Sequence, residues 1–163
     1  MAKTKKNVYK GFMNKYPILF QEKDLPMTET CMCWGIECPP GWVEILTKLC
    51  DKLEFLNNTI CKDNGMQIVA TQVKEKYGSL RMYYNLYPFL IKKNQEKTHQ
   101  LIDDMVHDLI RVVEWESENV CQVCGKYVFD HERIVSGGWI GYYCKECAEE
   151  KGIFVSAEIN DDV

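Results

Sequence analysis

Four cysteines near the C-terminus form two pairs with the spacing of a metal site. Cys121 and Cys124 make one Cys-x-x-Cys pair, nineteen residues follow, and Cys144 and Cys147 make the other. Two thiolates separated by two residues can hold one ion from a tight turn, and two such turns supply the four sulfurs that tetrahedral Zn²⁺ prefers. The sequence therefore predicts one Zn²⁺ ion per chain, held by these four residues.

The predicted zinc ion has a structural role, because four cysteines close its coordination shell. A catalytic zinc keeps one position open and usually has histidine or carboxylate among its ligands, and the sequence contains no His-Glu-x-x-His. The alternatives for two such pairs are a thiol–disulfide site and an iron–sulfur site. Aromatic and branched residues in 127–129 and 139–143 predict two short strands of a zinc ribbon around the ion.

Five further cysteines lie outside this pattern. Cys31, Cys33 and Cys38 fall within eight residues, and Cys50 and Cys61 follow downstream. They form a second metal site or a reactive thiol, or else they are small buried side chains with an occasional exposed thiol. The spacings Cys-x-Cys and Cys-x₄-Cys are not those of a zinc knuckle, which favours the second interpretation.

Basic and aromatic residues alternate around a predicted hairpin turn. Lys74 and Arg81 flank the turn and are interleaved with Tyr77 and Tyr83. Such residues on exposed strands can stack bases and hold phosphates, and they can equally form an ordinary solvated sheet face. Lys74, Arg81 and Tyr83, with Glu37 upstream, are therefore the candidate ligand-binding residues.

Helical periodicity predicts the elements that position these residues. Pro39-Pro40-Gly41 is a helix start signal, and apolar residues recur at helical spacing over 41–57. The strongest amphipathic pattern, over 94–117, predicts a long helix with one apolar stripe that includes Leu101 and Met105. A first, shorter helix is expected over 7–22, bent at Pro17, and a loop over 23–41.

Over 66–87 apolar residues recur at every second position instead of at helical spacing, which predicts a β-hairpin with Gly78-Ser79 at its turn. In the first strand, Val69, Thr71, Val73 and Tyr77 are expected on one side and Ile68 and Ala70 on the other. In the second strand Leu80, Met82, Tyr84 and Leu86 share a side. The predicted fold class is α+β: a small antiparallel hairpin or sheet packed by two main helices, with a C-terminal zinc ribbon.

Composition narrows the class of protein. The chain has 163 residues, of which 46% are hydrophobic, enough to bury a core. No segment approaches the roughly 20 apolar residues that span a bilayer, and no signal peptide is recognised, so we expect a cytoplasmic protein. The net charge is −4 and the pI about 5.5, which disfavours a nucleic-acid binder. The expected units are an α+β domain (1–118), a zinc-ribbon module (119–152) and an acidic tail (153–163).

Three sequence blocks together resemble a group of small uncharacterised proteins from bacteriophages and prophages. The first block is Cys-Trp-Gly-Ile-Glu-Cys at 33–38, followed by Gly41-Trp42. The second is the hairpin sequence 73–83, and the third is the pair of cysteine knuckles with Gly138-Trp139 before the second. The resemblance spans about residues 33–148. It implies a phage or prophage setting and carries over no functional residue.

Three hypotheses of function follow. The first is a zinc-binding interaction protein of phage type, which binds and blocks a host defence protein or its small nucleotide signal. The second is a nucleic-acid-binding accessory factor, because zinc ribbons often have that role. The third is a small enzyme whose site lies between Cys33, Glu37 and the hairpin residues Lys74, Arg81 and Tyr83.

Overall fold

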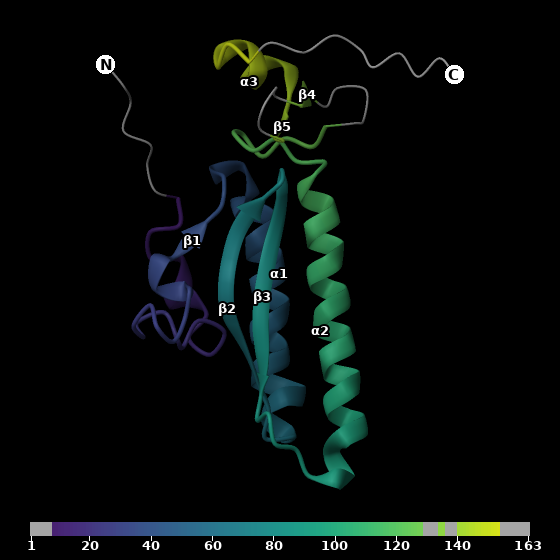
Figure 1. Ribbon diagram of the computed structural model, residues 1–163. Helices are drawn as coiled ribbons and strands as arrows, with labels where there is room; N and C mark the ends of the chain where they lie inside the picture. Colours follow the sequence, from purple (N-terminus) through teal and green to yellow (C-terminus); the bar gives the residue numbers. More distant parts are fainter. Residues whose placement is uncertain (1–7, 129–133, 136–139, 154–163) are drawn as a thin grey trace.

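The structure of the protein is a computed structural model, and it describes residues 8–128, 134–135 and 140–153 (Figure 1). Its main body is α+β, as predicted. A three-stranded sheet carries two long helices on one face, α1 (Val43–Leu56) and α2 (Glu96–Ser117). The two helices run in opposite directions beside each other, and side chains from the helices and the sheet share one core cluster.

The predicted hairpin is present as β2 (Gln67–Lys76) and β3 (Ser79–Tyr87), which pair antiparallel. The turn consists of Tyr77 and Gly78, one residue earlier than predicted. Their φ angles are 53° and 79°, and positive φ at both central residues is the requirement of a type I′ hairpin turn. The alternation predicted for β3 is confirmed, since its inward side chains Leu80, Met82 and Leu86 are buried and Tyr84 packs against the core.

The alternation predicted for β2 is wrong in its first half. The pairing register shifts between Ala70 and Gln72, where β2 has one more residue than its partner strand. A bulge of this kind reverses the side to which the following residues point. As a result Ile68 and Ala70 lie in the same core cluster as Val73, although simple alternation places them on the opposite side.

A third strand lies in the segment predicted to be a loop. β1 (Ile36–Glu37) pairs in parallel with β2, so that the strand order is β1-β2-β3. Short 3₁₀ helices flank it, η2 (Met32–Trp34) before and η3 (Pro40–Trp42) after. A strand of two residues is too short to show a period, which is why sequence periodicity misses it.

The prediction of a first helix over 7–22 is wrong for the residues that the structure describes. Only a 3₁₀ turn, η1 (Phe12–Lys15), forms, and successive turns follow it. Gly11 has a φ of 74°, a left-handed conformation that ends regular helix, and Pro17 removes a helical donor. The apolar positions are nevertheless buried: Phe12, Tyr16, Leu19 and Phe20 all lie in the core.

The helix predicted over 41–57 is confirmed as η3 followed by α1. After Leu56 the chain continues in a wider π-helical turn, η4 (Asn57–Cys61). The buried Asn57 side chain there joins the helix end to β2. Its Nδ2 donates to the Ile68 carbonyl at 2.9 Å, and its Oδ1 accepts from the Ile68 N–H at 2.7 Å.

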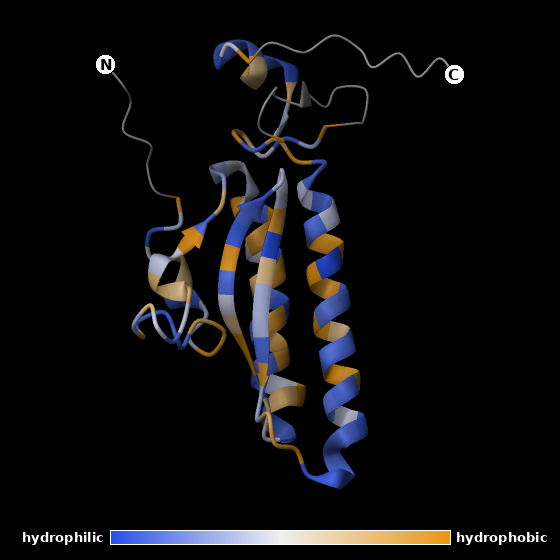
Figure 2. Cartoon of the chain, viewed as in Figure 1, coloured by the Kyte–Doolittle hydropathy of each residue, from blue (hydrophilic) through white to orange (hydrophobic). Residues whose placement is uncertain are grey.

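The long helix predicted over 94–117 is confirmed as α2, preceded by the 3₁₀ turn η5 (Lys93–Gln95). Its buried side chains are Ile102, Val106, Ile110 and Val113, whereas Leu101 and Met105 are exposed, contrary to the predicted stripe. Figure 2 shows hydrophobic and hydrophilic positions interleaved through the middle of the helix, with hydrophilic residues at its start. Among the described helices, none is long and apolar enough to cross a membrane.

The C-terminal module lies beyond the end of the sheet and of α2 (Figure 1). It contains an isolated bridge between Val120 and Tyr127, a two-stranded ribbon of β4 (Ile134–Val135) and β5 (Tyr142–Tyr143), and the helix α3 (Lys145–Glu150). β5 falls in the predicted strand 139–143, whereas its partner β4 lies after the predicted strand 127–129, in which Tyr127 makes the isolated bridge. Residues 129 and 139 of the predicted strands, and the tail after 153, lie outside the described residues. The proposed division into units at 118 and 152 stays a prediction.

Candidate metal centre

The four predicted metal ligands converge at one point. The Sγ atoms of Cys121, Cys124, Cys144 and Cys147 all lie within 4.8 Å of one another, and three of the four side chains are buried. The Sγ atoms of Cys124 and Cys144 are 3.7 Å apart. Four thiolates about 2.3 Å from a tetrahedral Zn²⁺ ion lie about 3.8 Å from one another, so the donor set fits such an ion.

The first pair sits in a tight turn held by its own backbone. The Gly125 N–H donates to the Cys121 carbonyl at 3.0 Å, and the Cys121 N–H donates to the Lys126 carbonyl at 2.8 Å. Gly125 has a φ of 79°, so a glycine suits the point where the chain reverses. This hydrogen-bonded turn directs both sulfurs to the same side.

The second pair is placed by α3. Cys144 precedes the helix in extended conformation, and Cys147 lies in its first turn. The Ala148 N–H donates to the Cys144 carbonyl at 3.0 Å. The change from extended to helical backbone brings two sulfurs three residues apart onto one side of the helix start.

The thiols in this cluster differ in how readily they ionise. Burial disfavours the Cys121 thiolate, but hydrogen bonds from the backbone of Cys124, Cys144 and Val123 outweigh burial and lower the pKa of Cys121 to about 7. Burial raises the pKa of Cys144 to about 11 and also raises the pKa of Cys147. A bound divalent cation favours the thiolate at every ligand, so metal binding releases protons here.

The start of the first helix holds the cysteine turn against the main body. The Gly41 N–H donates to the Gln122 carbonyl at 3.0 Å, and the indole Nε1 of Trp42 donates to the Val120 carbonyl at 3.3 Å. A Cβ atom added to Gly41 would lie 2.0 Å from the Cys121 carbonyl oxygen. The turn that carries the first cysteine pair and the start of the helix are therefore in direct backbone contact.

The tip of the hairpin supports the same module. The buried side chain of Gln122 donates from its Nε2 to the Gly78 carbonyl at 3.4 Å. A Cβ atom added to Gly78 would lie 2.7 Å from a methyl carbon of Ile140. The β2–β3 turn and the helix start thus contact the module from two sides of the body.

The four candidate ligand-binding residues lie together on the sheet. Glu37 is opposite Lys74, and Lys74 is opposite Arg81, so that the three form a row across the strands. Tyr83 follows two residues after Arg81 on the same face, which is opposite the helices, and its ring centroid lies 5.5 Å from Lys74 Nζ. The Arg81 guanidinium, however, lies 3.5 Å from a carboxylate oxygen of Glu114 on α2 and donates to the Ser79 hydroxyl oxygen at 2.6 Å. The charge of Arg81 is therefore directed toward α2, and Lys74 and Glu37 are the charged groups of this row that remain on the outer face.

The other five cysteines are separate from the cluster. Cys31 and Cys33 are exposed, and the Cys33 thiol donates to the Thr30 carbonyl at 3.3 Å. Cys50 and Cys61 are buried. The pKa of Cys38 is raised to about 12, mainly by burial and in addition by the nearby charges of Glu75 and Glu37. In the part of the chain that the structure describes, only the four C-terminal cysteines gather as possible metal ligands.

Sequence reasoning missed the residues that seat the cluster. In the sequence, Gly41 belongs to a helix start signal, Gly41-Trp42 belongs to a block of the resemblance, and Gln122 separates two predicted ligands. Their contacts join positions between 44 and 81 residues apart, and each ends on a backbone carbonyl, which produces no periodic or spacing signal. The one available clue was the run of two prolines and a glycine before a tryptophan at 39–42.

Comparisons with models of known protein families, with curated proteins and with solved structures give no match. Inference about function therefore rests on the geometry of the chain itself.

Proposed function

We propose that the cluster of Cys121, Cys124, Cys144 and Cys147 binds one structural Zn²⁺ ion, and that the protein works by binding a partner rather than by catalysis. The observation that carries the proposal is the convergence of four Sγ atoms within 4.8 Å. Thiolate donors in tetrahedral geometry select zinc or iron–sulfur centres, and two knuckles around one point suit a single zinc ion. With four sulfurs bound, the ion has no position left for a substrate.

The zinc ion stabilises the junction between the module and the main body. The first cysteine turn contacts Gly41, and Gln122 within that turn contacts Gly78. Without the ion, four thiols face one another at the centre of a module whose described helices and strands are all short. Metal binding then supplies folding free energy, as in other small zinc modules.

The outer face of the sheet is the proposed partner-binding surface. Lys74 supplies positive charge, the exposed ring of Tyr83 supplies a stacking surface, and Glu37 supplies an acceptor. Arg81 lies in the same row, with its guanidinium paired to Glu114. Such a set can bind the phosphate and base of a nucleotide, or a polar protein surface. In the phage setting that the sequence resemblance implies, the partner is a host defence protein or its nucleotide signal, in the host cytoplasm.

Metal analysis tests the zinc part of the proposal. We expect the purified protein to contain one zinc per chain and the Cys144→Ser variant to contain much less. Cys33→Ser is the matched control, because it removes an exposed thiol outside the cluster and leaves the zinc content unchanged. Full zinc content in Cys144→Ser, or a cluster of iron and sulfide in the unaltered protein, would contradict a Cys₄ zinc site.

Binding measurements test the surface separately. The double variant Lys74→Glu/Tyr83→Ala removes a cation and a ring from the outer face and should lose the partner while it retains zinc. Lys15→Glu reverses an exposed charge on another part of the surface and serves as the control for net charge. Nucleotides can be screened by calorimetry, and host proteins by cross-linking in cell extract followed by mass spectrometry. Equal binding by the double variant would place the interaction on another surface.

A further inference from the structure

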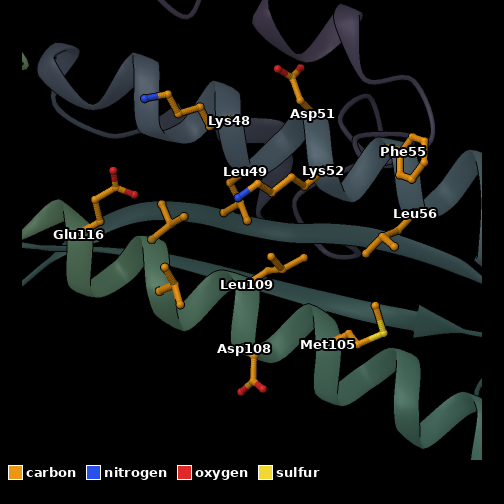
Figure 3. Close-up of a pocket in the computed structure, with 12 residues that line it drawn as sticks. Lys48, Leu49, Asp51, Lys52, Phe55, Leu56, Met105, Asp108, Leu109 and Glu116 are labelled. Carbon is orange, nitrogen blue, oxygen red and sulfur yellow. The ribbon is translucent and has the colours of Figure 1, made fainter.

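The outer surface of the two-helix layer carries a cluster of apolar side chains bordered by charged ones, although it faces away from the sheet. A groove of about 820 Å³ runs between α1 and α2, with Leu49 and Phe55 on one wall and Met105, Leu109 and Val112 on the other. Figure 3 shows this groove from the helix side, with the sheet behind it. We call the groove and the side chains that border it the α1–α2 face.

Large exposed side chains extend this face along the helices. On α2 they are spaced four, seven and three residues apart, so that they follow one stripe with the 3.5-residue period of helix–helix contacts. Phe55 on α1 lies across the groove from them. The exposed fractions of these side chains are between 37% and 71%: Phe55, Leu101, Met105, Val112 and Trp115. So much clustered apolar surface is typical of an interaction site.

The two walls of the groove have opposite net charge. Lys48, Lys52 and Asp51 line it from α1, and Asp108 and Glu116 line it from α2. The Asp51 carboxylate accepts a hydrogen bond from the Tyr16 hydroxyl at 2.9 Å. Lys48 pairs with Glu44 on its own helix at 2.8 Å. Among the described residues, Lys52 has no ion-pair partner, and Asp108 has only a histidine nitrogen of His107 at 3.9 Å.

We infer that the α1–α2 face binds a second copy of the same chain. A two-fold axis parallel to the helices places α1 of each copy over α2 of the other without changing position along the axis. Lys48 and Glu116 line one end of the groove, with Lys52 and Asp108 further along it (Figure 3). The lysines of one copy therefore meet the carboxylates of its partner, so the face is its own complement. An interface of this kind is isologous.

The size of the face suits a dimer. The 22 residues of α2 extend about 33 Å, and two adjacent helices cover a width of about 20 Å. The product, about 650 Å² before side-chain relief is counted, approaches the ~800 Å² per partner of stable complexes. The two sheets then face outward on opposite sides, and a dimer presents two copies of the outer sheet face.

Sedimentation and light scattering test the dimer with the full chain in its zinc-containing form. We expect a mass of 2 × 19.1 = 38.2 kDa at high concentration, with dissociation on dilution. Val112→Glu, at an exposed position, should shift the protein to a 19.1 kDa monomer that melts like the unaltered protein after dilution. Leu90→Glu replaces an exposed leucine elsewhere and should leave the dimer intact. A monomer at every concentration, or a dimer unaffected by Val112→Glu, would overturn the inference.

Charge exchange tests the orientation of the two copies. Lys52→Asp and Asp108→Lys should each weaken dimerisation about tenfold, because each places like charges across the interface. The double variant should recover most of the loss, since the pair is restored with its signs exchanged. Lys15→Glu lies outside the face and should have no effect. Additive loss in the double variant would overturn the proposed pairing of α1 with α2 of the partner.

Discussion

Gly41 and Gly125 lie in direct backbone contact, and this contact joins the start of helix α1 to the turn that carries Cys121 and Cys124. A Cβ atom on Gly125 would lie 2.7 Å from the Gly41 carbonyl oxygen, and one on Gly41 would lie 2.8 Å from the Gly125 nitrogen. The Gly41 N–H also donates to the Gln122 carbonyl at 3.0 Å. A side chain on either residue would separate two segments that are about 80 residues apart in sequence.

Gly41→Ala should therefore loosen the metal centre from a position that binds no metal. The added methyl group overlaps the Cys121 carbonyl oxygen, so the turn has to move and stability should fall by about 1–3 kcal/mol. Urea unfolding gives the stability, and competition with a zinc chelator gives the affinity, which we expect to fall as well. Gly65→Ala is the control, because its left-handed φ imposes strain but no atom lies near its added Cβ. Unchanged zinc affinity in Gly41→Ala would contradict coupling between the two segments.

Cys144→Ser should unfold the C-terminal module while the main body persists. The variant leaves three sulfurs, and the module loses the metal-binding free energy on which its fold depends. Limited proteolysis should then cut after residue 118, whereas the unaltered protein resists until chelator is added. A variant that resists proteolysis and melts like the unaltered protein would show that the module folds without the four-sulfur site.

The sequence predicted the parts of this structure that have long periods or strict chemical spacing. α2 and β3 repeat their patterns over several turns or pairs, and the four cysteines have the spacing that one tetrahedral ion requires. The helix predicted over 41–57 had both a proline start signal and a continuous apolar stripe. Their positions therefore follow from local sequence.

The remaining parts depend on contacts that leave no local pattern. β1 has two residues and forms only because β2 is beside it. The bulge before Gln72 exchanges the two faces of the sheet to which alternate side chains of β2 point, and no residue type there marks an insertion. The N-terminal segment has helical apolar spacing, yet the left-handed Gly11 and Pro17 prevent a helix and the same side chains pack from irregular turns. The candidate ligand-binding residues could be named from the sequence, but the position of Glu37 beside Lys74 could not be predicted, because it depends on the pairing of β1 with β2.

Ser117→Ala should weaken the contact between the end of α2 and the hairpin. The Ser117 hydroxyl oxygen accepts from the Leu80 N–H at 2.9 Å, and both residues are buried. Alanine leaves this N–H without a partner, at a cost of about 1–3 kcal/mol in the free energy of unfolding. Thr47→Ala removes a hydroxyl that donates only within its own helix, and should change stability little. Equal stability of the two variants in urea would contradict the role of Ser117.

Asn57→Ala tests the π-helical turn in the same way. Its amide group makes two hydrogen bonds with the backbone of Ile68, and the loss of both should cost about 2–4 kcal/mol. The neighbouring Asn58 is exposed and donates to the carbonyl of Glu54 on its own helix, so Asn58→Ala is the matched control. Thermal and urea unfolding of both variants provide the comparison. A loss in Asn58→Ala as large as in Asn57→Ala would mean that the pairing with Ile68 contributes nothing specific.

The central claim is that one zinc ion is bound by four cysteines, and native mass spectrometry tests it most directly. The freshly purified chain should carry the mass of one Zn²⁺ per 19.1 kDa subunit, and the adduct should disappear under denaturing conditions. At equal charge state the bound species should be heavier than the free chain by one Zn²⁺ ion less two protons, because the two charges of the ion replace those of two protons. A chain that carries no metal when freshly purified and binds no added Zn²⁺ would contradict the claim.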